Sequence, residues 1–135
     1  MRRAVVASAT AAAMLAGGCG TESSDLFVVE RTGSLPDAKL TLVVGDGNTV
    51  ECDGAEKPFA NELLLDARQL AEDLEPLLDK RTRLPEAQGS IVRYRVFNDL
   101  GEVRFADSSP GLPSELGQLI RLTRQIARDA CGRRR

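Results

Sequence analysis

Three cysteines, Cys19, Cys52 and Cys131, constrain the fold of this chain more than any other residues. The segment before Cys19 has a basic start and an apolar stretch from Ala4 to Ala16, a pattern typical of a signal peptide for export. Outside the cytoplasm thiols oxidise to disulfides, so an odd number of cysteines requires another fate for one of them. If Cys19 is modified, Cys52 and Cys131 remain as a disulfide pair, which would stabilise the fold by about 4 kcal/mol. Two free buried thiols, or a catalytic or metal-binding pair without a third ligand, are the alternatives.

The residues directly before Cys19 resemble the lipobox of bacterial lipoproteins. The apolar stretch ends in Leu15 and three small residues, and the cysteine follows at once. In that family the cysteine sulfur receives a diacylglyceryl group and the chain is cut directly before it. The resemblance therefore implies a signal peptide over 1–18, a lipidated cysteine with a short polar tether over 19–25, and a place on the outer face of the cell membrane.

One position departs from the lipobox pattern. The family usually has Leu three residues before the cysteine, whereas this chain has Ala16 there and Leu15 one residue further back. The alternative is an ordinary secretory signal cleaved near Ala11-Ala12-Ala13, which would leave a secreted protein without a lipid. Both interpretations predict export.

The composition favours one globular domain without histidine chemistry. The chain has 135 residues, 42% of them hydrophobic and 28% charged, which leaves enough after the signal peptide for one hydrophobic core. Histidine is absent, which excludes Ser-His-Asp and Cys-His catalytic systems and every metal site that needs imidazole. We therefore expect no catalytic residues, no metal and no cofactor. The mature chain is acidic and has no basic groove with aromatic residues, so nucleic acid is not an expected partner.

Hydrophobic periodicity predicts a single domain over 26–132, followed by a basic tail over 133–135. Apolar runs bounded by turn residues predict strands near 26–29, 40–44, 49–52, 91–97 and 102–107. Apolar residues spaced by three and four predict a helix with Asn61 as its N-cap, which ends or kinks before Pro76. A second helix is predicted to end at Cys131. The expected fold is α+β in the order β-β-β-α-β-β-α, an antiparallel sheet of four to five strands with both helices packed on one face.

The last predicted hairpin carries candidate binding residues. A four-residue turn would pair Tyr94 with Phe105 on the buried face, and Arg95 with Arg104 on the other. Arg93, Arg95 and Arg104 could then form a surface for an anionic partner. The alternative is that carboxylates on neighbouring strands compensate these charges, namely Glu30, Glu51 or Glu102. The tail Arg133-Arg134-Arg135 could similarly contact anionic lipid near the anchor, or simply suit the dipole of the last helix.

The layout of the mature chain also resembles the emfourins, small α+β bacterial proteins that inhibit thermolysin-like metalloproteases. The similar features are Val29-Glu30-Arg31-Thr32-Gly33, Tyr94-Arg95-Val96 and Gly101 in a hairpin, and Asp107, Pro113, Leu116 and Leu119 around the start of the last helix. The chain departs from the family by Gly33-Ser34 in place of paired glycines, by a cysteine-bearing hairpin between Val43 and Gly54, and by the lipid anchor. The resemblance implies a binding module, and no inhibitory contact residue can be transferred.

Three functions remain open at this point. The first is a membrane-anchored, extracytoplasmic and non-catalytic binding module, whose partner is an envelope or secreted protein; a protease inhibitor is one form of it. The second is a structural lipoprotein of the cell envelope without a tight partner. The third is a hydrolase that works without histidine. We expect the first, and we do not expect an enzyme.

Overall fold

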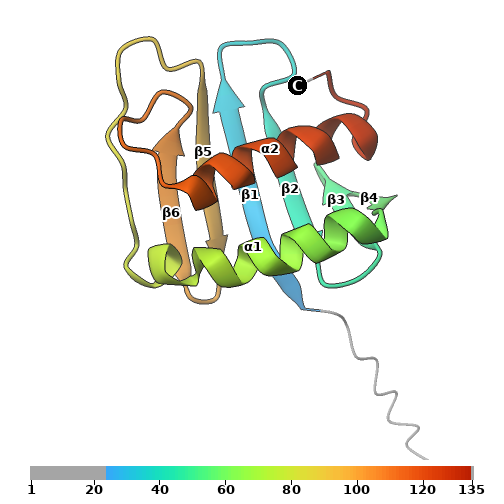
Figure 1. Ribbon diagram of the computed structural model, residues 1–135. Coiled ribbons are helices and arrows are strands. Elements are labelled where there is room, and N and C mark those ends of the chain that lie inside the picture. Colours follow the sequence, from blue (N-terminus) through green and yellow to red (C-terminus); the bar gives the residue numbers. More distant parts are fainter. Residues whose placement is uncertain (1–23, 135) are drawn as a thin grey trace, which may run out of the picture.

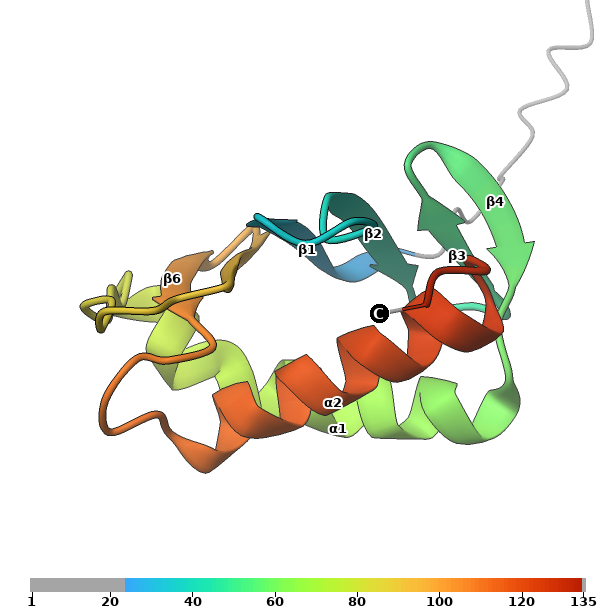
Figure 2. The same cartoon turned by 90° about the horizontal axis from the view of Figure 1, so that it is seen from above.

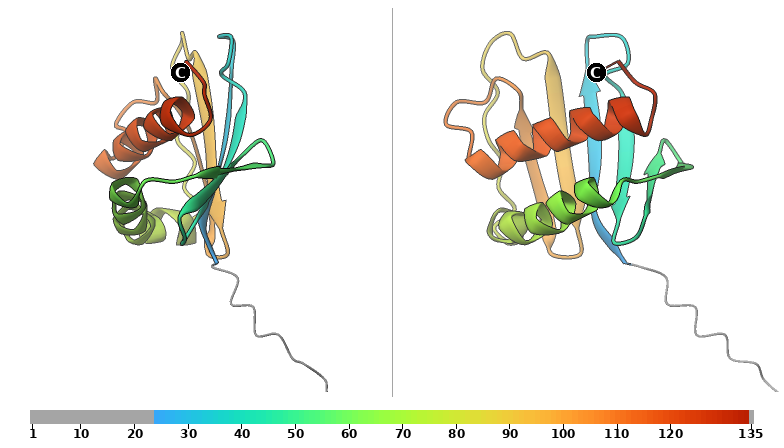
Figure 3. Two further views of the ribbon diagram at one scale, coloured as in Figure 1. Left: turned by 90° about the vertical axis from the view of Figure 1, so that its right-hand side faces the viewer. Right: turned by 45° about the vertical axis from the view of Figure 1, so that its right-hand side comes forward.

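Six strands form one antiparallel sheet in the order β4-β3-β2-β1-β5-β6 in the computed structural model, which describes residues 24–134. The strands are β1 (Asp25–Gly33), β2 (Leu40–Gly45), β3 (Thr49–Cys52), β4 (Ala55–Pro58), β5 (Val92–Asn98) and β6 (Gly101–Ala106). Two helices, α1 (Asn61–Asp79) and α2 (Ser114–Asp129), lie side by side over one face of this sheet (Figure 1). Figure 2 and Figure 3 show two layers, one of strands and one of helices, so these helices leave the second face of the sheet open. The α+β class with an antiparallel sheet and two helices is thus confirmed.

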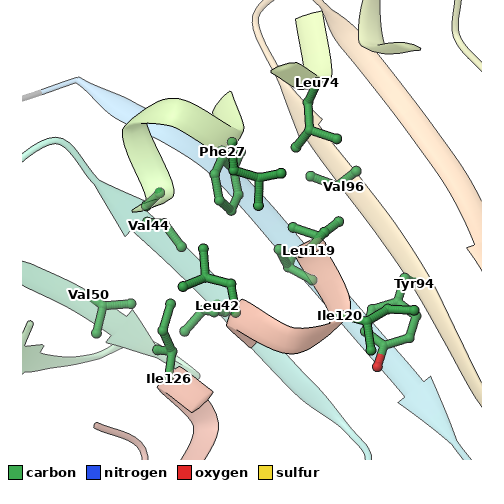
Figure 4. Packing of buried hydrophobic residues seen from close by; sticks show 14 of the residues in the cluster. Phe27, Leu42, Val44, Val50, Leu74, Tyr94, Val96, Leu119, Ile120 and Ile126 are labelled. Atoms are coloured by element: carbon green, nitrogen blue, oxygen red, sulfur yellow. The ribbon is translucent and has the colours of Figure 1, made fainter. Parts of the chain in front are cut away.

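The core lies between the two layers because side chains alternate along each strand. On β1, Phe27 and Val29 are buried, whereas Leu26 and Val28 on the opposite face are only half-buried. Figure 4 shows how strand and helix side chains meet in this layer: Phe27, Leu42, Val44, Val50 and Val96 from the sheet, and Leu74, Leu119, Ile120 and Ile126 from the helices. Each fully buried side chain of this size stabilises the fold by about 1.5–3 kcal/mol.

The hairpin of β5 and β6 has the predicted register. Tyr94 pairs with Phe105 and Arg95 pairs with Arg104. The rings of Tyr94 and Phe105 stack with their centroids 5.1 Å apart. The apolar pattern therefore set this register, because a slip of one residue would turn every buried side chain to the open face.

The strand β4 was not predicted, and the sheet has six strands rather than four to five. All residues of β4 are exposed, so no hydrophobic alternation marks it. It is joined to β3 by Asp53 and Gly54, which have φ values of 50° and 85°. An Asp-Gly pair with both residues in the left-handed region is the preferred two-residue hairpin turn. This turn, rather than burial, was the available signal for the extra strand.

Helix α1 begins one residue earlier than predicted, and at Pro76, where an end or a kink was expected, it does not end. Asn61 is its first residue and not its N-cap, and Ala60 precedes the helix without a side-chain cap. The helix also continues past Pro76, although proline removes one backbone donor. Leu74 and Leu78 are four residues apart and both fully buried, so the burial of Leu78 holds the last turn in helical conformation.

The end of α1 packs closely on the start of β6. A Cβ on Gly101 would lie 2.1 Å from the carbonyl oxygen of Leu78, so only glycine permits this approach. After the helix, the chain runs along the edge of β6. The Arg104 N–H donates to the Thr82 carbonyl at 3.0 Å, and the Leu84 N–H donates to the Arg104 carbonyl at 2.9 Å. This segment therefore covers the edge of the sheet.

The disulfide between Cys52 on β3 and Cys131 just after α2 is formed, as predicted. The Cα atoms of the two cysteines are 5.6 Å apart. Cys52 faces the core and is 7% exposed. Beyond Cys131, Gly132 has a φ of 66°, and the N–H of Arg133 donates to the Ala127 carbonyl at 2.7 Å. This turn directs the end of the described chain back over the sheet.

Candidate functional site

The arginines predicted from the last hairpin lie on the face of the sheet that α1 and α2 leave open. Arg95 donates to Glu102 at 2.6 Å and to Glu30 on β1 at 3.1 Å. Arg104 lies 3.4 Å from Glu102. One carboxylate thus bridges the two arginines that stand opposite one another, which removes the repulsion between them.

Arg93 is compensated from a different direction. It donates to Glu86, in the loop before β5, at 2.7 Å. Glu51, one of the expected partners, lies on β3, three strands away from β5 in the sheet order, which corresponds to about 14 Å. The hydrogen bond with Glu86 raises the pKa of Arg93, and the hydrogen bond with Arg95 lowers the pKa of Glu102. An anionic partner at this surface would have to compete with these carboxylates.

A second group of arginines lines a cavity of about 360 Å³ between β1, β5 and α2. We call it the arginine cavity. Its polar lining consists of Arg31, Tyr94, Asp107, Arg124, Arg128 and Arg134. Among residues 24–134, the lining contributes four guanidinium groups and one carboxylate, so the described part of the lining is positive. Its lining includes Arg31, near the end of β1, and Val92, the first residue of β5, so the cavity lies at this end of the sheet.

Arg31 forms the floor of the arginine cavity. It follows Phe27 and Val29 on the core-facing side of β1, so strand alternation points its side chain under α2, where it is 3% exposed. Its Nε donates to the Ala38 carbonyl at 2.7 Å, and its Nη2 donates to the Asp37 carbonyl at 2.9 Å. Burial lowers the pKa of Arg31, and the charge of Arg124 on α2 lowers it further, against the opposing influence of Tyr94. The loop carbonyls therefore hold a guanidinium in a partly desolvated position.

Tyr94 stands beside Arg31, because the two residues are direct partners in the pairing of β1 with β5. Its side chain is 3% exposed. Burial raises the pKa of the Tyr94 hydroxyl, while the charges of Arg124 and Arg31 act in the opposite direction. The cavity thus combines a neutral hydroxyl with guanidinium groups on two sides.

Arg124 and Arg128 extend from α2 over the cavity. They are four residues apart, so they lie on the same side of the helix, and both are exposed. Asp107 is the one carboxylate that the described residues contribute to the lining, and its Oδ1 accepts the N–H groups of Ile91 and Val92 at 3.2 and 3.3 Å. Asp107 therefore accepts hydrogen bonds from the backbone at the start of β5.

In the part of the chain that the structure describes, the two arginines of the basic tail, Arg133 and Arg134, make different contacts. Arg133 forms ion pairs with Asp37 at 3.7 Å and with Asp53 at 2.5 Å. Arg134 lines the arginine cavity instead. Both residues therefore lie over the domain, where Arg133 joins the loop before β2 to the turn before β4.

Part of this site was visible in the sequence. A charged residue at a core-facing position of a strand, as Arg31 is after Phe27 and Val29, signals a buried polar group with a specific role. Arg124 and Arg128 lie on α2. Nothing in the sequence placed them above Arg31, because β1 and α2 are far apart along the chain.

Some predictions concern parts of the chain that the structure does not describe. The signal peptide over 1–18 and Cys19 lie outside residues 24–134, as does Arg135. Within the described residues, no group of three or more His, Cys, Asp or Glu side chains could hold a metal ion. In the same range, neither helix has the length and hydropathy needed to span a membrane.

No protein-family model, curated protein or solved structure matches this chain. The resemblances to the bacterial lipoproteins and to the emfourins therefore stay predictions from the sequence. Function has to be argued from the sequence pattern and from the two groups of arginines.

Proposed function

We propose that this chain is an exported lipoprotein, anchored through Cys19, whose single domain is a non-catalytic binding module on the outer side of the cell membrane. The observation that carries the proposal is the disulfide between Cys52 and Cys131. Structural disulfides are typical of oxidising compartments, which supports export. Because this bond uses two of the three cysteines, Cys19 is left as the single thiol, at the position where the lipobox pattern requires it.

The position of β1 relative to the expected anchor supports a membrane-proximal domain. β1 begins at Asp25, and the residues from Cys19 onward reach at most about 20 Å when extended. The strand then runs for nine residues, about 30 Å, to Gly33. The arginine cavity lies at this far end, opposite the end at which the chain enters the sheet (Figure 1). The domain would therefore present the cavity away from the bilayer, where an extracytoplasmic partner can reach it.

The test is expression of the full chain in an exporting bacterial host, followed by membrane fractionation and intact-mass analysis. We expect the wild-type chain in the membrane fraction, with a mass that starts at Cys19, includes acyl chains, and lacks two hydrogens because of the disulfide. The C19A variant should lose the acyl mass and leave the membrane fraction.

The matched control is the C52A/C131A variant, which also removes sulfur atoms but keeps the anchor. It should remain in the membrane fraction. An unmodified N-terminus upstream of Cys19 in the wild-type protein would contradict the proposal, and so would a C19A variant that still fractionates with the membrane.

A further inference from the structure

We infer that the arginine cavity binds a small organic oxyanion, a carboxylate or a phosphate monoester with a short apolar part. The inference rests on the proposed function in that it names the ligand class of the binding module. It does not depend on the lipid anchor, because the residues that carry it lie within 24–134.

The positive charge of the lining favours an anionic ligand. Among residues 24–134, no carboxylate forms an ion pair with Arg124, Arg128 or Arg134. Asp107, the carboxylate within the cavity, accepts two backbone N–H groups. Like charges gathered at a partly desolvated site repel one another, and an anion bound between them removes that repulsion.

Several arginines near the cavity have carboxylate partners, whereas Arg121 on α2, like Arg124 and Arg128, forms no ion pair among residues 24–134. Arg93 and Arg95 have carboxylate partners on the open face of the sheet. Arg133, one residue before Arg134, pairs with Asp37 and Asp53. Within the described residues, the arginines on the open face of the sheet and Arg133 are thus compensated, whereas Arg124, Arg128 and Arg134 have no carboxylate partner and lie together at one cavity.

The placement of the polar groups around the cavity also favours an oxyanion. Arg31 is held by two loop carbonyls at 2.7 and 2.9 Å, so its charge is fixed in the floor before any ligand arrives. Tyr94 adds a hydroxyl beside it, and Arg124 and Arg128 approach from α2. Planar guanidinium groups recognise carboxylate and phosphate oxygens by paired hydrogen bonds, whereas a monatomic anion such as chloride cannot use that geometry.

The apolar part of the lining favours a ligand that also has an apolar part. Leu35, Ile91 and Val92 share the cavity with the arginines, and Ile91 is 42% exposed. A volume of about 360 Å³ lies at the lower end of the range for small-molecule sites. This combination fits a short organic anion better than an inorganic ion alone. The position of the cavity, at the far end of β1 from Asp25, disfavours a headgroup of the anchoring membrane.

The experiment is isothermal titration calorimetry on the full chain, purified in a non-ionic detergent, at pH 7 and at constant ionic strength adjusted with chloride. The probes are inorganic phosphate, butyl phosphate and pentanoate. Vesicles that contain an anionic phospholipid form a separate arm for lipid headgroups. We expect saturable binding of butyl phosphate or pentanoate, and the probe that binds more tightly identifies which oxyanion the site prefers.

The variants are R124Q and R128Q, both at exposed positions of α2 that should not affect folding. Each removes a charge-assisted hydrogen bond, so each should raise the Kd at least about tenfold. The matched control is R121Q, which removes the same charge from an exposed position of the same helix but does not line the cavity. Its Kd should stay within about twofold of the wild-type value.

Three results would overturn the inference. The first is that neither organic probe saturates, including the case in which only the vesicles bind. The second is that R121Q weakens binding as much as R124Q does, because the effect would then follow net charge. The third is that butyl phosphate binds no more tightly than inorganic phosphate and pentanoate does not bind, because the apolar lining would then have no role. A failure of lipidation at Cys19 would leave all of these measurements interpretable.

Discussion

Replacing both Cys52 and Cys131 with alanine should remove a large part of the stability of the domain. The bond joins residues separated by 79 positions, and the chain-entropy relation for a loop of that length gives about 4.5 kcal/mol at 25 °C. Domains of this size are typically stable by about 5–15 kcal/mol in total. The C52A/C131A variant should therefore fold, but with a small margin.

The assay is urea unfolding, monitored by circular dichroism, of the oxidised protein, the oxidised protein with added reductant, and the C52A/C131A variant. The reduced and substituted proteins should lose similar amounts of free energy of unfolding. In thermal unfolding, at roughly 4 °C per kcal/mol for a domain of about 110 residues, Tm should fall by about 18 °C. Hydrogen exchange should also accelerate after Ile126, because the disulfide holds the end of α2 to β3.

Two controls separate the bond from other effects of the substitutions. The C19A variant should match the wild-type domain in stability, because Cys19 takes no part in the bond. Reductant should not change the unfolding of the C52A/C131A variant. A loss below about 1 kcal/mol on breaking the bond would refute the loop-entropy reasoning, since it would mean that the unfolded chain gains little freedom without it.

The remaining predictions concern Gly101 and Glu102 on β6, with Gly117 on α2 as a comparison. G101A should lower the free energy of unfolding by more than about 2 kcal/mol, because the new Cβ would lie 2.1 Å from the Leu78 carbonyl oxygen. G117A, on α2, should raise it by up to about 1 kcal/mol because alanine favours the helix; chemical unfolding of both measures this, and equal effects would contradict the packing argument. The hydrogen bond with Arg95 is the main reason why the pKa of Glu102 lies below its ordinary value of 4.5. The ionised Glu102 therefore contributes to stability above pH 4.5, and this contribution is lost as the pH falls through the lowered pKa. Urea unfolding between pH 3 and pH 7 should therefore show a weaker pH dependence for E102Q than for the wild type, and an identical acid loss in both would be inconsistent with this ion pair.

The predictions that proved correct depend on local patterns. The register of β5 with β6 followed from apolar alternation, since Tyr94 and Phe105 had to share the buried face. The pairing of Cys52 with Cys131 followed from cysteine number and from the core-facing position of Cys52 on its strand. Neither conclusion required knowledge of which helix covers which strand.

The predictions that proved wrong are those in which one local rule was opposed by a feature elsewhere in the fold. β4 has no buried side chain, so only the Asp53-Gly54 turn marks it. The sequence predicted that α1 ends or kinks before Pro76; the helix does not end there, because the burial of Leu78 beneath it outweighs the lost hydrogen bond. Sequence periodicity cannot compare a local backbone preference with the gain from burial, because the gain from burial depends on which residues lie across the core.

The sequence by itself determined the class of the fold, the register of the last hairpin and the pairing of two sulfur atoms, because hydrophobic alternation and cysteine number act locally or by exclusion. Only the tertiary structure decided which carboxylates compensate the arginines of the hairpin and which arginines line the cavity. Glu30 and Glu102 reach Arg95 through neighbouring strands, whereas Arg124 comes to lie above Arg31 because α2 crosses the end of β1. Charge interactions extend over several ångströms in space and take no account of distance along the chain, so a cavity of this kind appears only once the helix is packed on the sheet.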